Sequence, residues 1–211
     1  MVGRAADEAR GLAIRAGVVE YRPSVWDARR WETAYGSGAL DYFGGLDERA
    51  RYSVLVGYLG WLTEAGERPA IVDVGCGPAL LRTRTPDEWI GRYVGVDPTE
   101  AAIEQARRLE LERSTFVVGT AADVRDDGPF DVVVCNEVLE MVDDAGALVD
   151  DLRALLRPGG HVLTSIWRHP GDHLLWRALD DRLQRVDRVH VRNERNPIGR
   201  RGWLVGVHQA T

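Results

Sequence analysis

Residues 70–79 (AIVDVGCGPA) constrain the fold of this chain more than any other stretch. A short apolar run ends at Val74 and opens into Gly75 and Gly77. Such a run is typical of a strand buried on both faces of a parallel sheet. Glycines directly after it let the backbone turn sharply and approach a ligand, in the crevice where the next helix begins. The stretch therefore predicts an α/β fold with a nucleotide site.

Six further strand patterns follow, with helical patterns between most of them. The last two are joined by a turn at residues 196–199 and favour an antiparallel hairpin. We therefore expect a doubly wound, Rossmann-like sheet of seven strands, mostly parallel with a C-terminal antiparallel hairpin. The six patterns lie at residues 93–96, 115–118, 130–136, 161–166, 186–191 and 203–207.

The segment before the glycine turn is rich in aromatic residues. Helical spacing predicts one helix from Ser24 to Gly36 and another over residues 46–65. Residues 1–66 are therefore expected to form a helical lid and residues 67–211 the ligand-binding core, as a single domain overall. A third short helix is expected over residues 80–89, broken near Pro86.

An acid follows the second predicted strand. Asp97 lies 22 positions beyond Gly75, where α/β nucleotide folds place the carboxylate that binds ribose hydroxyls. This spacing fits a nicotinamide site and an S-adenosylmethionine site equally. A dinucleotide motif, however, needs a third glycine where this chain has Leu80.

The stretch DVGCGPA resembles the first motif, D/E-x-G-x-G-x-G, of class I S-adenosylmethionine-dependent methyltransferases. Ala79 stands where that family most often has glycine. Three later stretches are similar to the family too: Ala122-Asp123 after the third strand, Asn136-Glu137 after the fourth, and LRPGG before the fifth. The resemblance covers about residues 70–208 and implies S-adenosylmethionine as the cofactor. The cofactor-binding residues that it implies are Tyr42, Asp73, Gly75, Cys76, Gly77, Asp97, Pro98, Ala122, Asp123, Val124, Asn136 and Glu137.

The same resemblance implies methyl transfer to a small-molecule acceptor, on oxygen or nitrogen, in specialised metabolism or on a sugar-type substrate. Many small-molecule members have histidine where Met141 stands, so the general base must be sought elsewhere. The candidate catalytic residues are Glu137, Glu140, His169 and His173. The alternative is a protein of this fold that keeps the cofactor but catalyses a non-methylating reaction such as a cyclisation, or acts as a binding subunit.

Composition limits the partners. The formal charge is −6 and no long basic run is present, which disfavours nucleic acid and acidic membranes. Two cysteines, Cys76 and Cys135, are too few for a disulfide framework and show no zinc spacing. We therefore expect a cytoplasmic protein without a metal site, present as a monomer or a homodimer.

Overall fold

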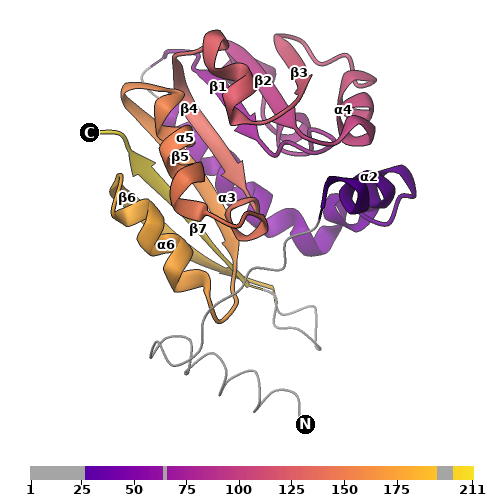
Figure 1. The fold of residues 1–211 in the computed structure, drawn as a ribbon. Coiled ribbons are helices and arrows are strands. Elements are labelled where there is room, and N and C mark those ends of the chain that lie inside the picture. Colours follow the sequence, from indigo (N-terminus) through magenta and orange to yellow (C-terminus); the bar gives the residue numbers. More distant parts are fainter. Residues whose placement is uncertain (1–26, 64–65, 194–201) are drawn as a thin grey trace, which may run out of the picture.

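The computed structural model describes residues 27–63, 66–193 and 202–211. Its seven strands form one sheet in the order β3-β2-β1-β4-β5-β7-β6 (Figure 1). β7 is antiparallel to both of its neighbours, and the other four neighbouring pairs are parallel. This confirms the predicted fold class. The strands are β1 (Ala70–Val74), β2 (Arg92–Asp97), β3 (Ser114–Val118), β4 (Phe130–Asn136), β5 (Leu156–Trp167), β6 (Gln184–Arg192) and β7 (Gly202–Gln209).

Helices cover both faces of the sheet, as apolar strands require. The apolar residues of α5 and α6 pack in one core cluster with β1, β4 and β5. Those of α3 and α4 pack in a second cluster on the opposite face, with β1, β2 and β7. In Figure 1 α5 and α6 lie in front of the sheet and α3 behind it. The helices are α2 (Ala28–Gly36), α3 (Leu46–Thr63), α4 (Glu100–Arg107), α5 (Ala145–Ala154) and α6 (Asp172–Asp180).

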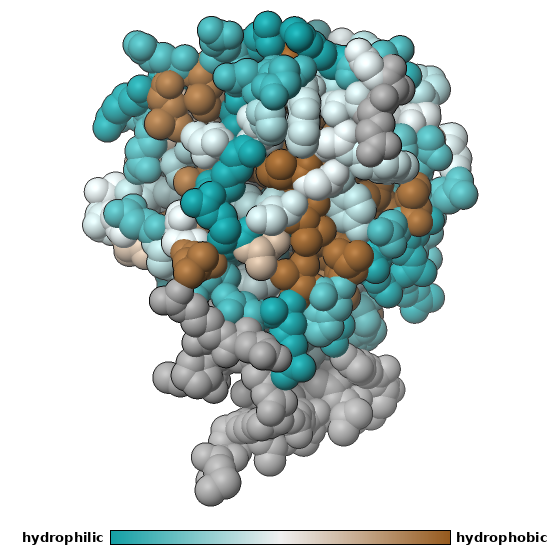
Figure 2. Space-filling model, turned by 180° about the vertical axis from the view of Figure 1, so that it is seen from behind, coloured by the Kyte–Doolittle hydropathy of each residue, from teal (hydrophilic) through white to brown (hydrophobic). Residues whose placement is uncertain are grey.

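α3 carries charged residues on its buried face. Glu48, Arg51, Tyr52 and Leu55 follow one another at helical spacing, and all four are buried. The face of the molecule opposite to that of Figure 1 shows several apolar patches among polar side chains (Figure 2). The two buried charges of α3, Glu48 and Arg51, form an ion pair with each other at 3.0 Å, as buried charges generally require.

Three predicted elements differ in detail. Residues 80–89 form two 3₁₀ turns, η2 (Arg82–Arg84) and η3 (Asp87–Trp89), in place of a helix. Pro86 lies between them and lacks the backbone N–H that a continuous helix needs. α2 begins at Ala28, where Asp27 Oδ1 accepts from Arg30 N at 2.8 Å. β5 begins at Leu156, within the LRPGG stretch that was expected to precede it. The predicted start of the first helix at Ser24 and the turn at residues 196–199 lie outside the described residues.

The remaining short elements are 3₁₀ turns at strand ends and between helices. They are η1 (Asp41–Gly44), η4 (Ala121–Asp127) and η5 (Leu139–Met141). Within the described ranges, no helix has the length and apolarity needed to cross a membrane.

Candidate active site

The glycine turn follows β1 as predicted. Gly75 has φ 74° and Gly77 has φ 52°, a left-handed conformation that glycine adopts at little cost. Gly77 N donates to Asp97 Oδ2 at 3.0 Å, which ties the turn to the end of β2. A Cβ on Gly77 would lie 2.9 Å from the Tyr35 hydroxyl oxygen. The side chain of Tyr35 therefore lies directly over the turn.

Ala79 is left-handed too, with φ 60°. Its methyl group is fully buried in the core cluster beneath the turn. A left-handed alanine costs about 1–2 kcal/mol relative to a right-handed one. The departure from glycine therefore introduces backbone strain, while the methyl group packs in the core.

Two carboxyl groups are buried beneath the turn. Asp97 accepts from Gly77 N and, through Oδ1, from Thr99 N at 3.0 Å. Burial raises its pKa, and hydrogen bonds from Thr99 and Gly77 counter the rise. Asp73 accepts from the Tyr93 hydroxyl, and burial raises its pKa to about 7. No described group forms a hydrogen bond with its Oδ1.

A network of polar side chains lies at the carboxyl ends of β4 and β5. Arg51 of α3 donates to Asn136 Oδ1 and, at 3.0 Å, to Glu48 Oε2. Ser165 Oγ lies 2.7 Å from Asn136 Oδ1 and 2.8 Å from Glu137 Oε1. Asn136 and Ser165 meet because they are paired in the β4–β5 register.

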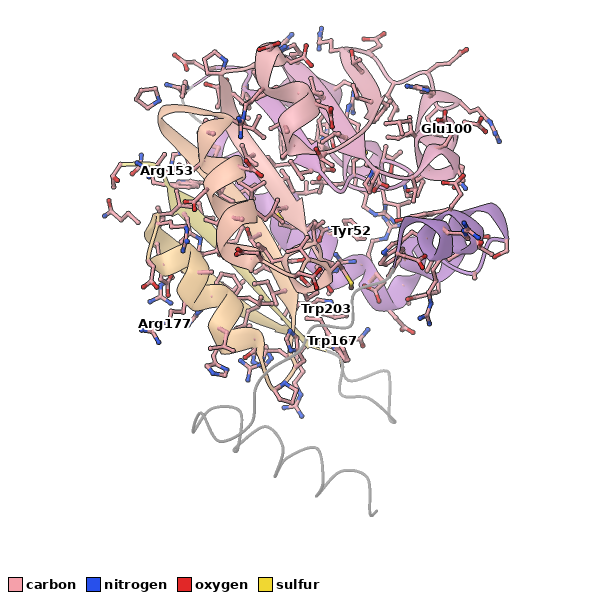
Figure 3. All side chains as sticks on the ribbon, in the orientation of Figure 1. Tyr52, Glu100, Arg153, Trp167, Arg177 and Trp203 are labelled. Carbon is pink, nitrogen blue, oxygen red and sulfur yellow. The ribbon has the colours of Figure 1, made fainter. Side chains whose placement is uncertain are left out.

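Aromatic rings surround this network. The Arg51 guanidinium lies 4.5 Å from the Tyr52 ring centroid and 5.7 Å from that of Trp203. Trp203 pairs with Trp167 across β7 and β5, and the Trp167 side chain is 47% exposed. Figure 3 shows both tryptophans at one end of the sheet and Tyr52 between the sheet and α2. Of these three rings, those of Tyr52 and Trp203 are buried and that of Trp167 is exposed.

Glu137 and Glu140 follow β4 directly. Glu137 has φ 61°, a strained conformation for a residue of its size. Burial raises its pKa, whereas Arg51 and Ser165 lower it. Glu140 is buried, and its Oε1 accepts from Trp167 N at 3.2 Å. Burial, and after it the nearby Glu137, raise the pKa of Glu140 well above its usual range.

The two predicted histidines follow β5. His169 Nδ1 accepts from Gly171 N at 3.1 Å, and burial lowers its pKa. His173 Nδ1 lies 3.2 Å from Pro170 O. His173 also lines a cavity of about 420 Å³ together with Trp176 of α6, a residue that packs on the face of the sheet opposite to α3. Glu137 and Glu140 lie close enough for the charge of Glu137 to raise the pKa of Glu140, whereas His173 lies on the opposite face of the sheet from α3.

The other predicted cofactor residues take different positions. Asp123 is exposed, and its Oδ2 accepts from Thr120 N at 2.8 Å in a capping box. The Val124 side chain is buried in the core, so only its backbone can meet a ligand. Pro98 and Ala122 are exposed, Cys76 is buried beside Gly77, and Tyr42 is 49% exposed and packs on Phe43.

Sequence reasoning missed four residues of the network: Glu48, Arg51, Ser165 and Trp203. A signal existed for the first two, since both occupy the helical face that carries Tyr52 and Leu55. Ser165 and Trp203 gave no such signal, because their approach depends on strand register.

The sheet order, the glycine turn and the acid after β2 define a class I methyltransferase fold. Comparison with family models agrees, because residues 47–201 match the methyltransferase domain. The chain therefore belongs to the methyltransferase domain family, and the resemblance seen in the sequence is confirmed.

Curated relatives share part of this chain. Ubiquinone biosynthesis O-methyltransferase of Vibrio parahaemolyticus is 35% identical over 100 residues, which are 45% of this chain and 42% of the relative. The enzyme of the same name from Ralstonia nicotianae is 36% identical over 117 residues, covering 53% and 48%. The chain thus spans about half the length of the curated relatives it matches.

A solved structure shares the fold. The N-methyltransferase NodS of Bradyrhizobium japonicum, in complex with S-adenosylhomocysteine, superposes with a TM-score of 0.70 at 16% identity. The superposition covers 87% of this chain and 97% of NodS.

Proposed function

We propose that this chain transfers a methyl group from S-adenosylmethionine to an oxygen or nitrogen of a small-molecule acceptor. The observation that carries the proposal is the buried carboxyl group of Asp97, tied to Gly77 at the end of β2 in a methyltransferase domain. An O-methyltransferase among the relatives and an N-methyltransferase among the structural neighbours support both acceptor atoms.

The residues at the strand ends fit S-adenosylmethionine. A carboxylate offers about four acceptor positions, and three described donors use Asp97: Gly77 N on Oδ2, and Thr99 N and Thr99 Oγ1 on Oδ1. Oδ2 therefore has a position left for a ribose hydroxyl. The Arg51 Nε–H is buried without a hydrogen-bond partner among the described residues, so it offers a donor to a ligand carboxylate. When bound, S-adenosylmethionine supplies an activated methyl group.

The chain's own contribution is to align the acceptor, exclude water and accept a proton. Asn136 and Glu137 lie at the end of β4, which in this family lies under the transferred methyl group. Among the four candidate bases we favour Glu137, because its carboxyl group belongs to the Arg51–Asn136–Ser165 network. Glu140 lies three positions beyond Glu137, and His169 lies four positions beyond Ser165 of the network, so both remain candidates.

We also propose that α2 closes over the cofactor. Tyr35 lies over Gly77, and Glu32 Oε1 accepts from Ala101 N at the start of α4 at 3.0 Å. Gln105 Nε2 donates to Tyr35 O at 3.2 Å, which fastens α2 to α4 a second time. Deleting residues 1–45 should abolish turnover while the sheet still folds by circular dichroism. Full turnover in the truncated chain would contradict the role of α2.

The function is tested by incubating the chain with S-adenosylmethionine and a panel of phenols, sugars and amines, with S-adenosylhomocysteine as the readout. If the chain transfers methyl groups, S-adenosylhomocysteine should form only when an acceptor is present, and an Asp97→Ala variant should form less of it when S-adenosylmethionine is limiting. A non-methylating protein of this fold would return the cofactor unchanged with every acceptor. That result would favour the cyclisation or binding alternative.

A further inference from the structure

The hydrogen bonds between β4 and β5 fix the position of a proton. The oxygen of the Asn136 amide is identified by Arg51, whose guanidinium can only donate. Asn136 Oδ1 therefore accepts from Arg51. Ser165 Oγ lies within hydrogen-bond distance of this oxygen and of Glu137 Oε1, at 2.7 and 2.8 Å.

A serine hydroxyl has one proton to donate. If Ser165 donates to Asn136 Oδ1, its contact with Glu137 Oε1 needs a proton that belongs to Glu137. If Ser165 donates to Glu137 instead, two oxygens 2.7 Å apart have no proton between them. The chain Arg51–Asn136–Ser165–Glu137 is therefore fully satisfied only when Glu137 is a neutral carboxylic acid.

The groups around Glu137 also favour its neutral, protonated form. The charged groups facing it are Arg51 and Glu48 on α3 and Glu140 on η5. The Arg51 guanidinium already donates to Glu48 and Asn136. Burial and the carboxyl groups favour the neutral acid, whereas Arg51 and hydrogen bonds from Ser165 and Trp203 favour the anion. The balance raises the pKa of Glu137.

We propose that Glu137 holds a proton in the free protein and releases it when the sulfonium of S-adenosylmethionine binds beside the end of β4. This inference rests on the proposed function, which places the positive sulfur there. A nearby cation favours the carboxylate form. Ser165 then turns its hydroxyl proton to Glu137, and the carboxylate is ready to act as the base.

The charges and atoms balance over one methyl transfer. On binding, the Glu137 carboxyl group loses one proton to solvent. During transfer, the acceptor oxygen or nitrogen forms a bond to the methyl carbon, the carbon–sulfur bond breaks with its electron pair going to sulfur, and the acceptor's proton passes to Glu137. The sulfur is then uncharged, so the neutral acid is again the favoured form.

Calorimetry tests the proposal through proton release. The full chain is titrated near neutral pH with S-adenosylmethionine and, separately, with S-adenosylhomocysteine, in buffers that differ in ionisation enthalpy. Binding of S-adenosylmethionine should make the protein release up to about one proton more than binding of S-adenosylhomocysteine does, because only S-adenosylmethionine carries the sulfonium. Glu137→Gln should abolish this difference, and its amide still offers Ser165 a donor, so the network stays intact.

Asp73→Asn is the control, because Asp73 is another buried acid near the site whose pKa is raised by burial, to about 7. This variant should keep the difference in proton release. The proposal is overturned if wild type releases equal numbers of protons with both ligands, or if Asp73→Asn abolishes the difference and Glu137→Gln does not. Absence of binding by either ligand would instead contradict the proposed function.

An infrared measurement gives a second readout. The wild-type spectrum should contain a carboxylic-acid C=O band that is absent in Glu137→Gln and that disappears when S-adenosylmethionine binds. A band that persists in Glu137→Gln and also survives binding in wild type would count against the proton on Glu137.

Discussion

Asp73→Asn should stabilise the ligand-free protein at alkaline pH. Asp73 is 2% exposed and accepts from Tyr93; burial and the nearby Asp97 raise its pKa, and the hydrogen bond from Tyr93 lowers it. Its pKa rises from 3.8 to about 7 on folding. An acid of this kind contributes stability below its unfolded pKa and loses that contribution as pH rises through its folded pKa.

The size of the effect follows from the two pKa values. One pKa unit corresponds to about 1.4 kcal/mol, so the step from 3.8 to about 7 corresponds to about 4 kcal/mol. Asn keeps an oxygen for the Tyr93 hydroxyl and carries no charge at any pH. The free energy of unfolding of the variant should therefore match that of wild type near pH 4 and exceed it by about 2–4 kcal/mol at pH 8.

Urea unfolding of both proteins at several pH values between 4 and 8 measures this difference. Acids that do not interact with Asp73 titrate equally in the two proteins, so the difference between the curves reports Asp73 together with its interaction with Asp97. A gap that stays constant with pH, or an Asn variant that is less stable at pH 8, would refute the reasoning. Cofactor affinity should fall in the variant, because a costly buried acid is retained where it serves function.

Three further predictions concern the site. Asp97→Ala should weaken S-adenosylmethionine binding by about 1–3 kcal/mol, since buried hydroxyls lose their acceptor; an unchanged Kd by calorimetry would contradict this. Gly77→Ala forces a left-handed alanine against the Tyr35 hydroxyl, so it should cost about 1–2 kcal/mol of stability and weaken cofactor binding; a thermal melt equal to that of wild type would count against the turn geometry. Glu137→Gln should lower kcat about 100-fold with cofactor affinity kept, whereas His173→Ala should change kcat less than about 2-fold; similar losses in both variants would remove Glu137 as the favoured base.

The fold could be predicted from the sequence because the residue patterns that indicate it are local. Apolar runs and the glycines after Val74 depend only on neighbouring residues, and each of the seven expected strand stretches lies in a strand of the structure. Residues 80–89 were predicted as a short helix broken near Pro86; the break is confirmed, but the two parts are 3₁₀ turns. An α-helix and a 3₁₀ turn have similar residue patterns, so the sequence alone could not distinguish them here.

The site could be predicted only in part, since its main contacts join segments that are far apart in the sequence. Asp97 was found because it follows a strand at a fixed spacing from Gly75. Ser165 meets Asn136 through strand register, and Arg51 reaches Asn136 across 85 positions. The left-handed conformation of Glu137 gave no signal, because glutamate disfavours it, whereas at Ala79 the glycine that the family most often has at this position was a signal.

The most direct test of the central claim is a crystal structure of the full chain with S-adenosylhomocysteine. The account predicts the ligand across the carboxyl ends of β1, β2 and β4, with its ribose hydroxyls in hydrogen-bond distance of Asp97 and its sulfur beside Asn136 and Glu137. A ligand bound elsewhere, or one whose ribose makes no contact with Asp97, would contradict it.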